Sequence, residues 1–161
     1  MEHAYLSLGS NQDPVENLSS ALAALRERFG DVRISAAYRF PAVGFDGADF
    51  VNLAAVVTTD LAPAELNAWL HALEDRHGRR RDVPRFSDRT LDIDIVLYGE
   101  QVLSGSGNLQ VPRDELRHAF VLRPLAEIAP DARHPLAARP LAELWREHAD
   151  YGRHFDVVAL A

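Results

Sequence analysis

Four stretches of the chain alternate apolar residues with small or polar ones, which is the period-two pattern of a half-buried β-strand. These stretches cover residues 4–9, 32–39, 50–59 and 91–98. Gly9, Ser10 and Asn11 end the first stretch, and Gly99 closes the last. Because residues of these types commonly end strands, we expect four separate strands.

Two further stretches carry apolar residues at every third or fourth position, which predicts amphipathic helices. The first covers residues 14–29, where Asp13 is placed to cap the helix and Pro14 suits its first position. The second begins at Pro63 and ends near Gly78. The resulting order, strand–helix–strand–strand–helix–strand, predicts an α+β fold with a ferredoxin-like βαββαβ core.

The last third of the chain is less regular, but nothing in it marks a second domain. We expect a turn at 105–108, a short helix at 119–128 broken by Pro124, another helix at 141–148 and an edge strand at 155–160. Residues 40–49 are rich in glycine, proline and aspartate, and we expect them to form a loop that lines a site. Residues 1–161 are therefore expected to form a single domain.

Composition narrows the possible classes of protein. Hydrophobic residues make up 47% and charged residues 25% of the chain, as is ordinary for a globular protein. The chain has no cysteine, which excludes disulfides, thiolate zinc sites and a cysteine nucleophile. No signal peptide or membrane-spanning run is visible, so we expect a soluble cytoplasmic protein that needs no membrane.

The charged residues are unevenly distributed. The formal net charge of −7 disfavours a general nucleic-acid-binding surface. All 17 basic residues are arginines, and six of them lie between Arg76 and Arg89. Because one guanidinium can bind two phosphate oxygens at once, this segment predicts a local phosphate-binding site. The absence of lysine excludes a Walker-type phosphate loop and Schiff-base chemistry.

Asp92 and Asp94 are the first candidates for chemistry. If their strand points Leu91, Ile93 and Ile95 into the core, both aspartates lie on the opposite face, with α-carbons about 6–7 Å apart. Two carboxylates this close repel each other unless a cation lies between them. Hard oxygen ligands at this spacing suit Mg²⁺ bound together with substrate phosphates. The alternative interpretation is the solvent-facing polar side of an edge strand.

The arginines that precede this strand favour the metal interpretation. The irregular stretch before Asp92 contains Arg79, Arg81, Arg85 and Arg89. Phosphoryl transfer depends mainly on positioning and on neutralisation of charge by metal ions and arginines. Together these features predict a site for metal-assisted phosphoryl transfer. An exposed basic loop that pairs with surface carboxylates is the alternative.

Asn52 interrupts an otherwise apolar strand, where a buried amide needs hydrogen-bond partners. Its donor and acceptor match the edge of a heteroaromatic ring, and Phe50 could stack on such a ring. An asparagine at the frayed start of a strand is the simpler alternative.

Several segments resemble one known family over essentially the whole chain. They are AYLSLGSN, YRFPAVG, DFVNLAAVV, LEDRHGRRR and, most specifically, RFSDRTLDIDIVLYG followed by VPRDELRHAFVLRPLAEIAPD. These segments resemble the 6-hydroxymethyl-7,8-dihydropterin pyrophosphokinase (HPPK) family of the folate pathway. The resemblance implies the family's α/β sandwich, elaborated on the ferredoxin-like core. It also implies transfer of pyrophosphate from ATP to the hydroxymethyl group of a reduced pterin, with release of AMP.

The resemblance further implies roles for individual residues. Asp92 and Asp94 would hold two Mg²⁺ ions on the ATP phosphates, and the catalytic arginines would be Arg79, Arg81 and Arg89. The pterin site would consist of Phe40, Pro41, Val43, Phe50, Asn52, Phe86 and Phe120. The residues near the nucleotide would be Glu74, Arg81, Arg85, Arg89, Ile95, Arg113 and His118. ATP and a reduced pterin would be the partners of a monomeric enzyme.

The chain departs from the family mainly on the nucleotide side. Arg113 follows Val-Pro where the family usually has histidine, and His118 stands where it usually has arginine. Ser87 and Asp88 replace the Gly-Pro that precedes the signature arginine. These changes put the ATP affinity in question, so a pterin-binding paralogue with altered or lost ATP-dependent transfer is an alternative. An RNA-binding ferredoxin-like module is a third hypothesis, and the acidic net charge disfavours it.

Overall fold

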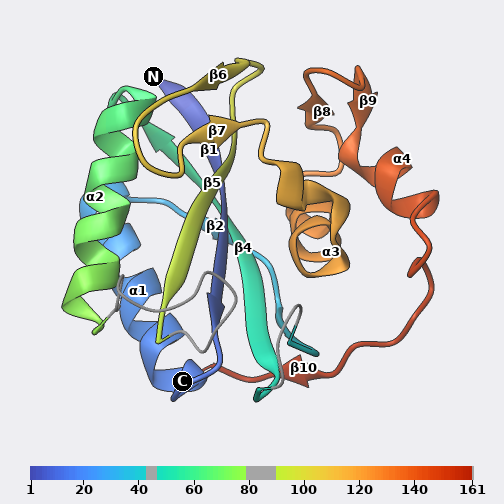
Figure 1. The fold of residues 1–161 in the computed structure, drawn as a ribbon, viewed down its shortest axis with the longest axis horizontal. Helices are drawn as coiled ribbons and strands as arrows, with labels where there is room; N and C mark the ends of the chain where they lie inside the picture. The colour runs from blue at the N-terminus through green and yellow to red at the C-terminus, as the bar shows by residue number, and fades with distance from the viewer. Residues whose placement is uncertain (43–46, 79–89, 161) are drawn as a thin grey trace.

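A six-stranded antiparallel sheet forms the centre of the computed structural model, which describes residues 1–42, 47–78 and 90–160 (Figure 1). The strands run in the spatial order β10-β3-β4-β1-β5, and β2 also pairs with β4. Their bounds are β1 (Glu2–Ser10), β2 (Arg33–Ile34), β3 (Ala37–Phe40), β4 (Phe50–Thr59), β5 (Asp92–Tyr98) and β10 (Val157–Val158).

The predicted βαββαβ core is confirmed. Helix α1 (Pro14–Phe29) follows β1, and α2 (Pro63–Arg76) follows β4. The prediction of one continuous strand over residues 32–39 is wrong, because the chain breaks between β2 and β3. At the break, the Ser35 N–H donates to the Ala54 carbonyl and the Ala54 N–H donates to Ser35 Oγ, both at 2.9 Å. The serine side chain thus replaces a regular ladder contact.

Helices cover both faces of the sheet, so the molecule has three layers (Figure 1). Helices α1 and α2 pack on one face, and α3 (Ala119–Ile128) packs on the other. The core between the sheet and α1/α2 includes Leu6, Leu8, Leu18, Leu25, Leu66, Leu70, Ile93 and Ile95. The core under α3 includes Tyr38, Phe40, Val56, Val96, Val121, Leu122 and Leu125.

Short elements complete the last third of the chain. They are the hairpin β6 (Leu103–Ser104) and β7 (Gln110–Val111), the 3₁₀ helix Asp114–Arg117, the hairpin β8 (Arg133–His134) and β9 (Arg139–Pro140), and α4 (Leu141–Arg146). The Arg113 N–H donates to the Val96 carbonyl at 2.9 Å, which fastens the chain after β7 to the edge strand β5. The predicted helix at 141–148 and edge strand at 155–160 are confirmed, although both are shorter than expected.

Two local expectations are wrong. Pro124 does not break α3, which is continuous over ten residues. A proline in a helix interior costs about 3 kcal/mol, but this one is buried in the core under α3, where apolar packing opposes that cost. Asp13 does not cap α1 with its side chain; its backbone is left-handed, and its carbonyl accepts the Asn17 N–H at 3.0 Å.

None of the helices in the described ranges combines the length and the apolar character needed to span a bilayer.

Leu6 tests the core between the sheet and α1/α2, because its side chain is fully buried there on the central strand β1. We expect Leu6→Ala to lower the free energy of unfolding by about 2–5 kcal/mol, since it removes apolar contacts and leaves a cavity. Urea unfolding measures the change. Leu136→Ala is the matched control, because Leu136 is 68% exposed and its truncation should stay within about 0.5 kcal/mol. Equal losses in the two variants would contradict this description of the core.

Candidate active site

Asp92 and Asp94 lie on the edge strand β5, on the face opposite the α1/α2 core. Ile93 and Ile95 pack into that core, and side chains alternate along a strand, so the two carboxylates share one face as the sequence predicted. Asp94 is only 7% exposed, whereas Asp92 is half-buried. The pair therefore places one nearly dehydrated carboxylate next to a more accessible one.

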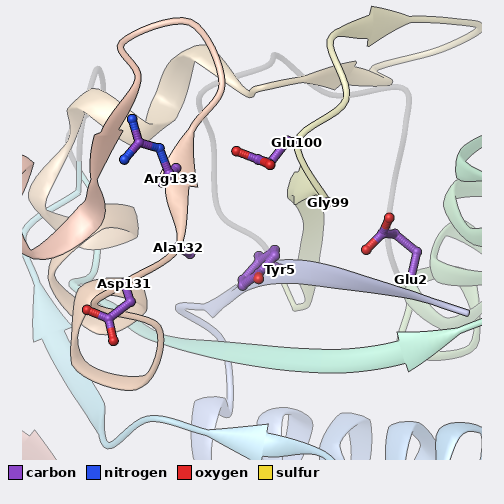
Figure 2. A pocket seen from close by; sticks show the side chains of 7 residues that line it. All are labelled: Glu2, Tyr5, Gly99, Glu100, Asp131, Ala132 and Arg133. Atoms are coloured by element: carbon purple, nitrogen blue, oxygen red, sulfur yellow. The ribbon is translucent and has the colours of Figure 1, made fainter.

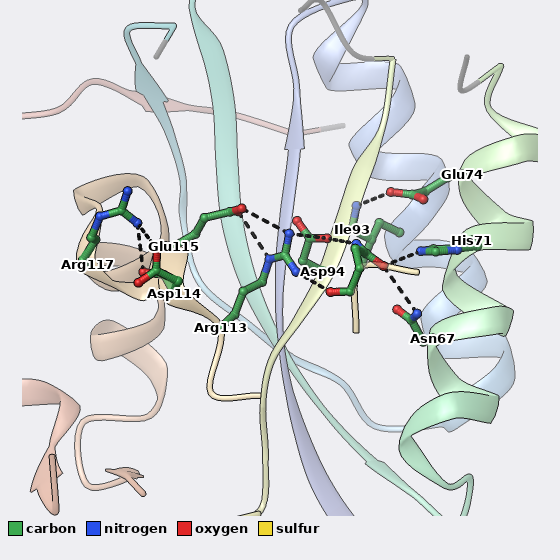
Figure 3. Close-up of polar contacts among 10 residues, drawn as sticks. Asn67, His71, Glu74, Ile93, Asp94, Arg113, Asp114, Glu115 and Arg117 are labelled. Atoms are coloured by element: carbon green, nitrogen blue, oxygen red, sulfur yellow. Dashed lines mark hydrogen bonds and ion pairs between the residues drawn. The ribbon is translucent and has the colours of Figure 1, made fainter. Parts of the chain in front are cut away.

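Two donors approach the Asp94 carboxylate (Figure 3). Asn108 Nδ2 donates to Asp94 Oδ1 at 2.8 Å. Arg113 Nη2 lies 3.6 Å from the same oxygen, and it also forms an ion pair with Glu115 at 3.1 Å. Arg113 Nη1 donates to the Asn108 carbonyl at 2.8 Å, so the three residues form a closed set of contacts.

Burial raises the pKa of the Asp94 carboxyl well above its usual value. The neighbouring Asp92 carboxylate raises this pKa further, and the Arg113 guanidinium opposes both effects. The same repulsion that raises the pKa makes the pair receptive to a bound cation, because a cation would stabilise both charges at once.

Helix α2 holds Asn108 in place from the other side. His71 Nε2 lies 2.9 Å from Asn108 Oδ1, and Asn67 Nδ2 donates to the same oxygen at 3.4 Å. Because Asn108 Oδ1 is an acceptor, His71 donates from Nε2, and the amide nitrogen of Asn108 is directed at Asp94. The turn at 105–108 is thereby fixed against both α2 and β5.

Glu74 links α2 to the edge of the sheet. It is 2% exposed, and its Oε2 accepts the Ile93 N–H at 2.8 Å. The N–H of an edge strand has no neighbouring strand to pair with, so this carboxylate takes the place of one. Glu74 was predicted to lie near the nucleotide, and that role stays a prediction.

A row of residues crosses three strands next to the carboxylates. Gly9 of β1 pairs with Asn52 of β4 on one side and with Asp92 of β5 on the other. A Cβ built on Gly9 would lie 2.5 Å from Asn52 Nδ2, which is too close for any real contact. The Asn52 side chain therefore lies across the Gly9 backbone, in the direction of β5.

Asn52 carries a buried polar atom with unused hydrogen-bonding capacity. It is 6% exposed, and its Oδ1 has no hydrogen-bond partner among the described residues. A buried acceptor without a partner costs free energy, so it calls for an explanation, and a bound ligand that donates to it is one. This orphan acceptor fits the predicted recognition of a heteroaromatic ring edge.

Aromatic rings lie on the same face of the sheet. Phe40 of β3 pairs with Phe50 of β4, and the Phe40 ring lies 6.5 Å from that of Phe120, edge to face. His118 stacks on Phe120 with centroids 5.1 Å apart. The structure thus places Phe40 beside both Phe50 and Phe120, and the pterin site that includes these rings and Asn52 stays a prediction. Pro41 is exposed just beyond β3.

The remaining predicted residues divide into two groups. Val43, Arg79, Arg81, Arg85, Phe86 and Arg89 lie outside the described residues. Ile95 is described, but its side chain is 3% exposed in the α1/α2 core, so only its backbone could contact a nucleotide. Burial lowers the pKa of His118, and the Arg117 charge lowers it further, which favours the neutral imidazole at neutral pH.

Sequence reasoning missed Gly9, Asn67, His71 and Asn108. Gly9 was read only as a strand terminator and Asn108 only as part of a turn. A polar residue at position 67, next to the apolar stripe of its helix, was the available signal, since a buried amide needs a partner.

An open polar pocket lies at the other end of β1 and β5 (Figure 2). It is lined by Glu2, Tyr5, Gly99, Glu100, Asp131, Ala132 and Arg133, none of which was predicted to belong to the site. The pairing of Ala4 with Tyr98 and of Gly9 with Asp92 separates this pocket from the carboxylates by most of the length of β1.

Asp92 and Asp94 suit a metal ion that is bound jointly by the protein and by a substrate. Within residues 1–42, 47–78 and 90–160, no group of three or more histidine or acidic side chains is arranged to hold a metal ion. Asp92 and Asp94 supply hard oxygens on one face, and Mg²⁺ is commonly held by one or two carboxylates plus substrate phosphates. The two aspartates therefore fit a metal that arrives together with a polyphosphate.

Comparison with known proteins gives one consistent result. Residues 5–130 match the sequence model of the 7,8-dihydro-6-hydroxymethylpterin-pyrophosphokinase family. The 2-amino-4-hydroxy-6-hydroxymethyldihydropteridine pyrophosphokinase of Pseudomonas aeruginosa is 43% identical over 141 residues, which cover 84% of this chain and 85% of the relative. The protein of the same name from Haemophilus influenzae is 37% identical and covers 92% of this chain and 94% of its own length.

A solved structure agrees in fold. The crystal structure of Plasmodium falciparum HPPK-DHPS superposes with a TM-score of 0.70 at 15% identity. The match covers 93% of this chain but only 44% of that one. At this identity the likeness concerns the fold alone.

The contact between Gly9 and Asn52 gives a prediction about stability. We expect Gly9→Ala to cost about 1–3 kcal/mol, because the added methyl must displace the Asn52 amide. In an Asn52→Ala background the obstacle is gone, and the same change should cost close to nothing. Urea unfolding of the four proteins in this cycle measures the coupling. An equal cost of Gly9→Ala in both backgrounds would show that Asn52 does not occupy the space above Gly9.

Proposed function

The chain belongs to the 7,8-dihydro-6-hydroxymethylpterin-pyrophosphokinase (HPPK) family, and we propose that its catalytic site is built on the Asp92 and Asp94 carboxylates of β5. Members of this family are enzymes of folate biosynthesis. The reaction transfers pyrophosphate from ATP to the hydroxymethyl group of 6-hydroxymethyl-7,8-dihydropterin and releases AMP. One observation carries the assignment of the site: two carboxylates share one face of an edge strand, one strand away from Gly9 and two from Asn52.

In the proposed site, Asp92 and Asp94 would hold two Mg²⁺ ions together with the ATP phosphates. Such ions neutralise negative charge on a polyphosphate as it reacts. The shared face, the mutual repulsion of the carboxylates and the burial of Asp94 all support this assignment. Arg79, Arg81 and Arg89 are proposed to supply further positive charge, on the strength of the sequence pattern that precedes β5.

Asn52 is proposed to bind the edge of the pterin ring. Its Oδ1, which has no hydrogen-bond partner among the described residues, would accept from a ring N–H or amino group. Phe50 and Phe120 are proposed to stack on the ring, with Phe40 behind them. Pro41, Val43 and Phe86 complete the proposed pterin site.

The nucleotide is proposed to contact Arg81, Arg85, Arg89, Arg113 and His118, with Glu74 and Ile95 close by. The substrate hydroxyl is a weak nucleophile, but we propose in-line attack without a strong protein base. Support comes from His118, whose ring is stacked on Phe120 and whose pKa is lowered by burial. The His118 ring therefore forms part of the wall of the proposed site and does not act as a strong base.

Asp94→Asn tests the metal assignment. The change keeps the shape of the side chain but removes its charge, so we expect pterin-dependent AMP formation to fall on the order of a thousandfold. Chromatographic measurement of AMP gives the rate, and far-UV circular dichroism verifies the fold. Asp131→Asn is the control, because Asp131 is exposed at the other end of the sheet and its loss should leave the rate unchanged. Normal turnover in Asp94→Asn would refute the assignment.

Asn52→Leu separates binding from stability. We expect the free energy of unfolding to stay constant or rise, because the change removes a buried acceptor for which the described part of the chain offers no partner. Pterin affinity should fall about tenfold to a hundredfold through the lost hydrogen bonds. Calorimetry measures the affinity, and urea unfolding measures the stability. An unchanged affinity would exclude Asn52 from the pterin site.

A further inference from the structure

We propose that Arg113 is an exchangeable counter-cation: it neutralises Asp94 while the site lacks metal, and it passes to a nucleotide phosphate when metal and nucleotide bind together. The inference rests on the proposed metal role of Asp94. It assigns to Arg113 a positioning and specificity role that the chain's own geometry supports.

Arg113 and Asp94 form a largely buried ion pair. The side chain of Arg113 is 13% exposed and that of Asp94 is 9% exposed, so the pair lies mostly out of water. The distance of 3.6 Å between Arg113 Nη2 and Asp94 Oδ1 is within ion-pair range, but it is longer than a hydrogen bond. Arg113 thus stabilises the carboxylate by charge, while Asn108 supplies the direct hydrogen bond at 2.8 Å.

Arg113 and a metal ion would compete for the same carboxylate. A divalent cation held by Asp94 would lie close to the guanidinium, and two positive charges at such a distance repel strongly in a site with little water. A metal ion that binds without nucleotide must therefore either displace Arg113 or bind against its electrostatic repulsion. Arg113 is expected to weaken the binding of free metal ions.

Two other contacts would hold Arg113 near the site after it leaves Asp94. Arg113 Nη1 donates to the Asn108 carbonyl at 2.8 Å, and Glu115 accepts from Nη2 at 3.1 Å (Figure 3). These two contacts do not involve Asp94, so they can keep the guanidinium beside the carboxylates. A triphosphate bound there would offer oxygens that suit an arginine fork.

The exchange couples the two ligands. Free metal is opposed by Arg113, whereas a metal–nucleotide complex brings both a cation for Asp94 and an anion for Arg113. Arg113 therefore favours binding of the metal–nucleotide complex over binding of the free metal ion. The difference is a coupling free energy between the metal and the nucleotide. The competing interpretation is a static brace, in which Arg113 only holds Asp94 in position and its loss weakens every ligand.

Two titrations of Arg113→Met distinguish these interpretations. The first measures Mn²⁺ binding without nucleotide, by the electron paramagnetic resonance signal of the free ion. The second measures binding of Mg²⁺ with α,β-methylene-ATP by calorimetry. We expect Mn²⁺ to bind about tenfold more tightly than in the wild type and the nucleotide complex about tenfold more weakly. Thermal unfolding verifies that the variant is folded.

Three further variants make the test specific. Arg113→Lys keeps the charge but loses the fork, so Mn²⁺ binding should resemble the wild type while nucleotide binding weakens. If Arg113→Met does not fold, the two titrations of Arg113→Lys test the proposal in its place. Arg146→Met removes the same charge from an exposed position on α4 and should change neither titration. Asp94→Asn should abolish Mn²⁺ binding.

The outcomes separate the two hypotheses. Undiminished Mn²⁺ binding in Asp94→Asn would overturn the metal site itself. If Asp94→Asn abolishes Mn²⁺ binding but Arg113→Met leaves it unchanged or weakens it, the metal site stands and the exchange is refuted. Weaker binding of both ligands in Arg113→Met would identify Arg113 as a static brace.

Discussion

Withdrawing the Asp94 carboxylate from water costs several kcal/mol unless charges and donors replace its lost hydration. Three separate parts of the chain contribute to that replacement: Asn108 from the turn after β6, Arg113 from the segment after β7, and α2, which orients Asn108 through His71. The edge strand, the turn and the helix are thereby held in one arrangement. The segment 105–113 is also held along β5 by the Arg113 N–H bond to the Val96 carbonyl and by the burial of Leu109 and Val111 in the α1/α2 core.

The sheet also fixes how far apart the two halves of the proposed site can lie. Asn52, Gly9 and Asp92 occupy one row across β4, β1 and β5, and neighbouring strands lie about 4.8 Å apart. The backbones of Asn52 and Asp92 are therefore held about 10 Å apart by the sheet, and the Asn52 amide lies over Gly9 between them. Such a spacing suits a flat ring on one side and phosphates on the other, and it does not depend on loops.

Periodicity alone was enough to predict the βαββαβ core and the shared face of Asp92 and Asp94, because both follow from alternation along strands. Asn52 was singled out because it interrupts an apolar strand, and Phe50 because it lies beside Asn52 in that strand. Phe120 came from family resemblance, since no local pattern relates residues this far apart in sequence. The contacts of Asp94 were not predictable, because Asn108 and Arg113 approach it through tertiary structure. The break at Ser35 was missed for a similar reason: a side chain replaced a ladder bond that strand propensity assumes.

The last strand has a consequence for biosynthesis. Val157 of β10 pairs with Tyr38 of β3, and the Phe155 ring lies 4.6 Å from that of Phe40, behind the proposed pterin site. While the ribosome is still making residues 41–150, β3 therefore has an uncovered edge, and Phe40 lacks one of its aromatic neighbours. Exposed strand edges invite pairing with other chains. Nascent chains of this protein would thus expose the unpaired edge of β3, which is prone to aggregation, until the segment around residue 157 has left the exit tunnel. Only then would Phe155 pack against Phe40 behind the proposed pterin site.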